Sequence, residues 1–170
     1  MTPTAIFHDV VVPGLLYMTR AIGPGGPTTD APARVMIMSI WGQESDWRYR
    51  RQNGGPARSY GQFESGGGVA GVMGNATTSK WLQTVCAALD IPYDRSTIFE
   101  AMAWNDLLAL AMTRFNLWCA PGPLPAVGQR DAAWNYYVNQ WRPGKPHPDA
   151  WPRNYDTAMR VVMGDAPVTA

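Results

Sequence analysis

Charged residues are scarce in this chain of 170 residues. Lys, Arg, Asp and Glu make up 16% of it, against about 25% in typical soluble domains. The net charge is +1 with no basic stripe, which argues against a nucleic-acid binder. No window reaches about 18 unbroken apolar residues, so no membrane span is expected. The N-terminal stretch has no basic region and carries Pro13 inside its apolar run, so no secretory signal peptide is expected.

Cysteine and histidine are also few. The chain holds Cys86 and Cys119, and His8 and His147. Neither cysteine has another Cys or His at ligand spacing, which argues against a zinc site. No metal or organic cofactor is expected. Two buried free thiols are the default, which would fit synthesis in a reducing cytoplasm, although a disulfide stays open.

Apolar and aromatic residues are abundant. Apolar residues make up 46% of the chain, with 8 Trp and 7 Tyr. Such aromatics can fill a rich core, or they can line a carbohydrate cleft where flat rings stack on sugars. The length fits one domain, spanning 1–170, with a substantial core.

Helical periodicity dominates the sequence and predicts an all-α fold with about six helices. Caps and breakers place the first helix over 7–23, capped by Asp9 and ended by Gly23, and the second over 30–45, capped by Asp30. Residues 51–75 are glycine-rich and predict a loop or small hairpin, and the tail 164–170 is expected to be loose. The remaining helices are expected over 75–91, 95–119, 126–141 and 149–163.

Glu44 is the leading candidate for chemistry. It lies at the end of the apolar, Trp-bearing helix 30–45. Partial burial would raise its pKa towards about 6, which suits a general acid near neutral pH. The alternative is a surface Glu, or a carboxylate paired with Arg48 or Arg50.

Three short elements occur in order after the start of that helix. They are Glu44-Ser45, then "SYGQF" with Gly61-Gln62, then Ala133-Trp134-Asn135. Together they resemble the soluble lytic transglycosylase family and its goose-type lysozyme relatives, over residues 31–141. The second element is shortened, and the third has Trp where the family has Tyr. The Pro-rich segment and helix of 142–163 are similar to an ending in phage-encoded members.

The resemblance implies a lysozyme-like fold with the glycine-rich loop beside a cleft, and gives Glu44 a role. It would protonate the glycosidic oxygen of the β-1,4 bond between N-acetylmuramic acid and N-acetylglucosamine in peptidoglycan glycan strands. In transglycosylases the muramic C6 hydroxyl then attacks C1 and leaves a 1,6-anhydro end, whereas in lysozymes water attacks.

The chain is therefore interpreted as a peptidoglycan lytic transglycosylase of a phage. It would be carried in the virion or made in the host cytoplasm for lysis, and would be delivered to the periplasm or cell wall. One alternative is a lysozyme (muramidase) that hydrolyses the same bond. Another is a structural component of a phage particle, bound to other phage proteins, that kept the fold.

Glu64 is an open second candidate. If it faces the cleft, it could position water and favour hydrolysis, because two-carboxylate glycosidases hold both acids beside the scissile bond. If it points away, a mechanism with one Glu is favoured. It could also be a solvated loop carboxylate near Arg58.

Six further residues are candidate substrate contacts, and two of them have a structural alternative. Gln62 would contact the sugar near the scissile bond. Tyr60 is either a cleft wall or a ring packing the loop onto the core. Ser45 either supports Glu44 or a sugar acetamido group, or bonds the helix backbone. The later element adds Trp134, Asn135 and Tyr137.

Two other segments have open roles. The basic run Arg48, Arg50 and Arg51 is either a solvated face or an attraction for the acidic peptide stems of peptidoglycan. The Pro-rich segment after residue 141 either folds over the core or docks on a larger assembly.

Overall fold

The computed structural model describes residues 1–164, and over this range the chain is all-α, as predicted. The lysozyme-like arrangement stays a prediction. No β-strand forms within these residues. The glycine-rich segment has only two isolated β-bridges, Arg51 with Arg58 and Arg58 with Phe63, where a small hairpin was expected. The expectation for the tail falls on residues 165–170, outside the described range.

The N-terminal helical run combines two α-helices with one wide π-turn. Its parts are α1 (Pro3–Ile6), η1 (Phe7–Val11) and α2 (Val12–Ile22). Thr2, not Asp9, is the cap, because the Thr2 Oγ1 accepts a 3.1 Å hydrogen bond from the Ala5 N–H. The wide turn lies before Pro13, whose ring would collide with the carbonyl of an ordinary α-helical turn. Gly23, at φ 76°, ends the run as predicted.

The rest of the chain forms shorter helices than the sequence predicted. They are α3 (Ala31–Ser45), the π-turn η2 (Ser65–Val69), α4 (Ala70–Gly74), α5 (Thr78–Ala88), α6 (Arg95–Ala101), α7 (Asp106–Cys119), α8 (Arg130–Trp141), the 3₁₀ turn η3 (Pro148–Ala150) and α9 (Trp151–Met163). Two expectations were wrong. Residues 65–74 are helical rather than loop, and the helix expected over 95–119 is interrupted. The interruption occurs because the Asn105 Oδ1 accepts a hydrogen bond from the Leu108 N–H and caps a new helix.

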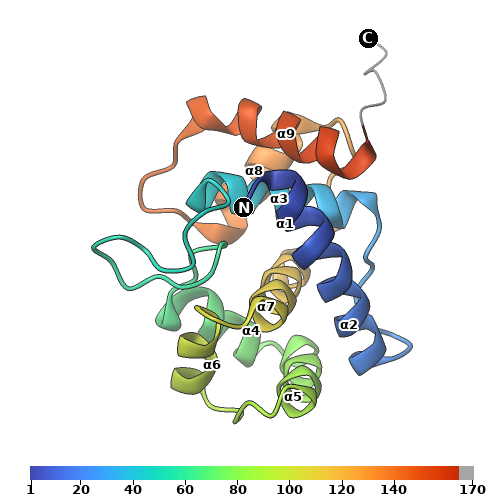
Figure 1. Ribbon diagram of the computed structural model, residues 1–170, viewed down its shortest axis with the longest axis vertical. Helices are drawn as coiled ribbons and strands as arrows, with labels where there is room; N and C mark the ends of the chain where they lie inside the picture. The colour runs from blue at the N-terminus through green and yellow to red at the C-terminus, as the bar shows by residue number, and fades with distance from the viewer. Residues whose placement is uncertain (165–170) are drawn as a thin grey trace.

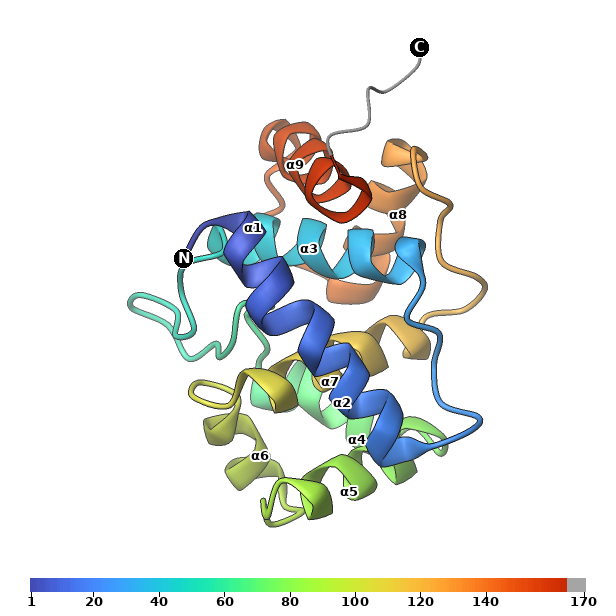
Figure 2. The ribbon, with the colours of Figure 1, turned by 45° about the vertical axis from the view of Figure 1, so that its right-hand side comes forward.

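The helices are arranged in two groups around α7. Figures 1 and 2 show α9 lying over α3 and α8 at one end of the molecule, and α4, α5 and α6 at the other. The run from α1 to α2 passes along the side and packs on α7 and α5. Every residue of α7 from Leu108 to Leu117 is buried, so this helix is the centre of the core.

The two central helices are joined by a buried polar contact. The Trp41 Nε1–H on α3 donates to the Thr113 Oγ1 on α7 at 3.0 Å. Both side chains are fully buried, so the bond satisfies polar atoms that would otherwise be stranded in the core. It fixes the C-terminal half of α3 against α7, and α9 packs along α3.

Both cysteines are free thiols, as the default expectation had it. Cys86 is buried and Cys119 is half-buried. Burial raises the pKa of Cys86 to about 11 and raises that of Cys119 as well. Both thiols are therefore protonated near neutral pH.

The helical run Pro3–Ile22 is long and apolar enough to cross a membrane, judged by its 20 residues and mean hydropathy of 1.2. Core helices and N-terminal signal sequences meet the same criterion. In the fold this run has Ile6, Val11 and Leu15 buried, and it packs against α7. The absence of a membrane span stays a prediction from the sequence.

Candidate active site

Glu44 lies in the last turn of α3, and its carboxylate is partly buried. The Glu44 Oε1 accepts a 2.6 Å hydrogen bond from the Tyr137 hydroxyl on α8. The two residues are 93 positions apart in sequence, so the fold creates this pair. Neither Arg48 nor Arg50 pairs with Glu44, so the structural alternative of an arginine partner is wrong.

Burial dominates the protonation of Glu44. Loss of solvent raises its pKa from the ordinary 4.5 to about 7, while the hydrogen bond from Tyr137 acts in the opposite direction by stabilising the carboxylate. Burial and the neighbouring Glu44 charge both raise the pKa of Tyr137, so this phenol remains a proton donor in the hydrogen bond. A substantial fraction of Glu44 is therefore protonated at neutral pH, as a general acid requires.

Tyr137 is held in place by a cluster of aromatic rings. Its ring stacks on Trp151 of α9 with centroids 5.2 Å apart and planes 12° apart. Trp134 lies one helical turn before Tyr137 on α8, with centroids 5.4 Å apart. Trp141 lies one turn after it, at 6.4 Å. This packing leaves the Tyr137 hydroxyl little freedom, so it fixes one oxygen of Glu44.

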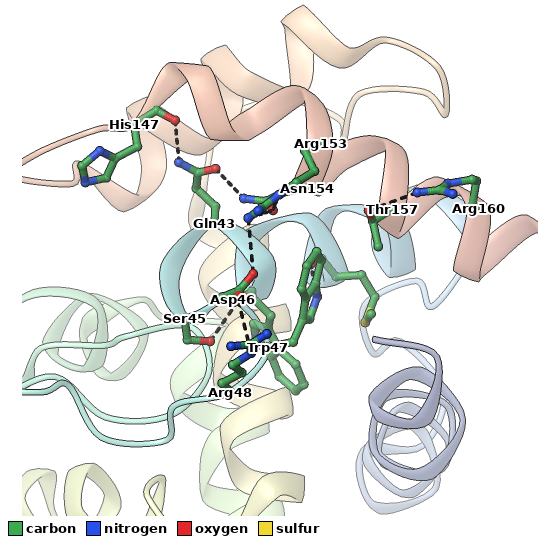
Figure 3. Close-up of polar contacts among 12 residues, drawn as sticks. Gln43, Ser45, Asp46, Trp47, Arg48, His147, Arg153, Asn154, Thr157 and Arg160 are labelled. Carbon is green, nitrogen blue, oxygen red and sulfur yellow. Dashed lines mark hydrogen bonds and ion pairs between the residues drawn. The ribbon is translucent and has the colours of Figure 1, made fainter. Parts of the chain in front are cut away.

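Polar contacts fix the residue on the N-terminal side of Glu44. The Gln43 Nε2 donates to the His147 carbonyl at 2.9 Å, and the Gln43 Oε1 accepts from the Asn154 Nδ2 at 2.9 Å. Figure 3 shows these bonds joining the end of α3 to α9 and to the segment before it. The Pro-rich segment therefore folds over this domain, as one of its two predicted roles required.

The residues after Glu44 turn back onto the helix. Asp46 and Trp47 take left-handed backbone conformations, at φ 51° and 55°. The Asp46 carboxylate meets Arg153 of α9 at 3.3 Å (Figure 3). The Trp47 Nε1–H donates to the Met38 carbonyl at 2.9 Å, and its ring covers Gly42 so closely that a Cβ there would lie 2.3 Å from it.

Ion pairs hold the loop 46–64 to neighbouring helices. Arg50 makes two 2.7 Å hydrogen bonds to Asp106 at the start of α7. Arg58 bonds Glu100 of α6 at 2.8 Å, and Arg51 approaches the same carboxylate at 3.3 Å. Arg48 lies 3.3 Å from the carboxylate of Asp46, so each arginine of the basic run has an internal partner. The run therefore anchors the loop to the fold, and its attraction for acidic peptide stems stays a prediction.

Three predicted contacts of the loop and helix end have internal partners. The Ser45 hydroxyl is buried and donates to the Trp41 carbonyl at 2.9 Å, which is its structural alternative. Tyr60 is 1% exposed, with its ring 4.9 Å from that of Trp41, so it packs the loop onto the core. The Gln62 Nε2 donates to the Ser59 carbonyl at 2.7 Å and the Tyr49 carbonyl at 3.2 Å, which closes the loop on itself.

The other candidates differ in exposure. Trp134 is half-buried beside Tyr137, so part of its ring is accessible for stacking. Asn135 is exposed and its side chain makes no hydrogen bond within residues 1–164. Glu64 is exposed, and its carboxylate has no ion pair in the same range; Arg58 pairs with Glu100 instead. Among the later residues, Tyr137 alone contacts Glu44 through a hydrogen bond.

The sequence reasoning missed three residues that organise this site. Gln43 and Asn154 bond each other, and Trp151 stacks on Tyr137. Asn154 is 1% exposed although it lies on a helix with polar neighbours. No local signal separates such a buried Asn from a surface one, because its burial depends on how α9 packs on α3.

Neither metal ligands nor pockets extend the candidate site in the described part of the chain. No group of three His, Cys, Asp or Glu side chains in the described part of the chain could hold a metal ion. Two pockets in the described part of the chain are lined by residues around Tyr155 and around Arg114, and neither includes Glu44. The candidate site is thus defined by Glu44, Tyr137 and their supports.

Comparison with protein-family models, with curated proteins and with solved structures finds no match to this chain. A partly buried carboxylic acid, bonded through one oxygen to a fixed phenol, can donate a proton near pH 7 and accept one afterwards.

Proposed function

We propose that this chain cleaves the glycan strands of peptidoglycan as a lytic transglycosylase, with Glu44 as the general acid and base. The observation that carries the proposal is the pairing of a half-buried Glu44, whose pKa is raised to about 7, with the Tyr137 hydroxyl. The order of the three motifs along the chain supports the choice of substrate.

The reaction transfers two protons, first one from Glu44 and then one to it. Protonated Glu44 gives its proton to the oxygen of the β-1,4 bond as that bond breaks, and C1 of the muramic acid gains oxocarbenium character. The resulting Glu44 carboxylate takes the proton of the muramic C6 hydroxyl while that oxygen bonds to C1. The products are a 1,6-anhydro end and a free hydroxyl on the leaving sugar, and Glu44 is protonated again.

Tyr137 would act by positioning the acid. Its bond to Oε1 leaves Oε2 for the proton that is transferred. It also stabilises the carboxylate formed after the first step, so the pKa of Glu44 does not rise further. The exposed part of the Trp134 ring, beside Tyr137, is a surface on which a sugar could stack.

Hydrolysis of the same bond is the alternative reaction. It would need a second group that positions water, and Glu64 was the candidate. The Glu64 carboxylate is exposed and has no partner in residues 1–164 that would orient it. This favours the mechanism with one carboxylate. A role of the chain as a virion-associated or lysis enzyme, delivered to the cell wall, is part of the same proposal.

The test is digestion of purified peptidoglycan, with the released muropeptides read by mass spectrometry. The proposal expects 1,6-anhydro products from the wild type and none from Glu44→Gln. Products heavier by one water would replace the transglycosylase with a lysozyme. No release from a folded wild-type chain would contradict enzymatic activity and favour a structural role in a particle.

A further inference from the structure

Arg114 is a buried cation that the active-site proposal does not use. It lies on the central helix α7 and is 2% exposed. Its Nε donates to the Thr28 carbonyl at 2.7 Å, and its Nη2 meets the Thr28 hydroxyl at 3.3 Å. The Nη1 has no hydrogen-bond partner among residues 1–164, and no carboxylate there lies within ion-pair distance of the guanidinium.

Such an arrangement is costly for the fold. A buried charge without a counter-ion loses its hydration without replacement, and a buried donor without an acceptor adds a further penalty. Burial accordingly lowers the pKa of Arg114, while the more distant Tyr136 and Asp30 act in the opposite direction. The Asp30 carboxylate accepts a hydrogen bond from the Ala33 N–H as the cap of α3, and it makes no ion pair with Arg114.

Arg114 also forms part of the wall of a pocket of about 500 Å³. The pocket lies where the start of α3, the end of α7 and the middle of α8 meet. Its lining is mostly apolar or aromatic, with few polar groups: Thr28, Asp30, Pro32, Arg114, Leu117, Trp118, Ala120, Gly122, Pro123, Leu124 and Tyr136. The Tyr136 hydroxyl already donates to the Leu117 carbonyl, so the unused polar capacity of the pocket is concentrated on Arg114.

We propose that this pocket binds a small organic carboxylate. The carboxylate oxygens take Nη1, which has no partner, and the second N–H of Nη2, whose other N–H meets the Thr28 hydroxyl. The apolar body of the ligand lies against Leu117, Trp118 and Leu124. A planar carboxylate matches this edge of a guanidinium with two parallel hydrogen bonds.

The charge of the pocket favours a monoanion. Asp30 lies in the lining and would repel the second charge of a phosphate dianion. Residues 122–124 form one wall of the pocket, and the segment 121–124 makes no hydrogen bond to the rest of the described chain. Because the Nη1 lies below the surface, the proposed binding requires an outward shift of this segment that lets a ligand oxygen reach it.

The pocket is separate from the candidate active site. Asp30 caps one end of α3 and Glu44 lies at the other, about 20 Å away at 1.5 Å per residue. The inference therefore does not depend on the proposed glycan cleavage. Glu44→Gln should leave ligand binding unchanged.

The test is calorimetric titration of the full chain with hexanoate, with uncharged hexanamide as the matched probe. Wild type and Arg160→Met, which removes an exposed arginine of α9, should bind hexanoate saturably at millimolar concentration or below. Arg114→Met should weaken binding by about 10- to 100-fold, the usual loss of a hydrogen bond to a charged group. Hexanamide should bind wild type correspondingly more weakly.

A second variant tests the proposal if Arg114→Met does not fold. Leu124→Glu adds a carboxylate at the half-buried loop wall and should compete with hexanoate for Arg114. Absence of saturable hexanoate binding by wild type would overturn the proposal. So would equal binding of hexanamide, or unchanged affinity in Arg114→Met or Leu124→Glu.

Discussion

Replacing Glu44 with Gln should stabilise the protein increasingly as the pH rises. The pKa of Glu44 is about 7 in the folded chain against an ordinary 4.5, so the unfolded state ionises first. The contribution of this group to stability is fully present below about pH 4.5 and is lost as the pH rises through about 7. At about 1.4 kcal/mol per pKa unit, the loss is at most about 3.5 kcal/mol, and partial exposure of the side chain reduces it.

The variant lacks this titration but keeps an acceptor for the Tyr137 hydroxyl. Urea unfolding at pH 5 and at pH 8, followed by Trp fluorescence, measures the free energy of unfolding of both chains. The stability of Glu44→Gln relative to wild type should rise by about 2 kcal/mol between the two pH values. Glu64→Gln is the matched control, since that carboxylate is exposed, and should show little such rise. A constant difference between Glu44→Gln and wild type would refute the buried, neutral Glu44.

Other predictions address the supports of the site. Tyr137→Phe removes the hydrogen bond that stabilises the Glu44 carboxylate, so the pKa of Glu44 should rise above about 7. The alkaline limb of the pH–rate profile should then move to higher pH, and an unmoved limb would contradict this. Gly42→Ala places a Cβ 2.3 Å from a buried indole and should cost about 1–3 kcal/mol in urea unfolding, whereas Gly71→Ala, which meets no atom within 4 Å, should cost nothing. Asp106→Asn breaks the bidentate ion pair with Arg50 that anchors the loop 46–64. It should lower the free energy of unfolding by about 1 kcal/mol and speed proteolysis within that loop. Equal cleavage rates in the variant and the wild type would argue against this anchor.

Local sequence signals predicted the elements that depend on local contacts. Asp30 caps α3 and Gly23 ends α2, because a side-chain cap and a left-handed glycine act within one turn. The burial of Glu44 followed from the apolar helix that carries it. The break before α7 was missed because the apolar pattern continues across Asn105, while a single cap there outweighs that pattern.

The partners within the site depend on long-range packing, which the sequence does not display. Asn135 and Tyr137 are two residues apart on α8, so they point to different faces, and only Tyr137 faces Glu44. Trp134 shares the face of Tyr137 because it lies three residues before it. The Gln62 amide turns to its own loop because the φ of 48° at this residue closes a tight turn. The motif order indicated the region of the site but could not indicate which side chains meet.

The pH dependence of glycan cleavage by wild type and Glu44→Gln tests the central claim most directly. Peptidoglycan strands are the substrate, and the initial rate of muropeptide release is measured from pH 5 to pH 9. The wild-type rate should fall as the pH rises through about 7, when Glu44 loses its proton. Glu44→Gln, folded and at least as stable, should be slower by about 10²–10⁴ at pH 6. A variant that cleaves at the wild-type rate, or a wild-type rate that does not change across this range, would contradict Glu44 as the general acid.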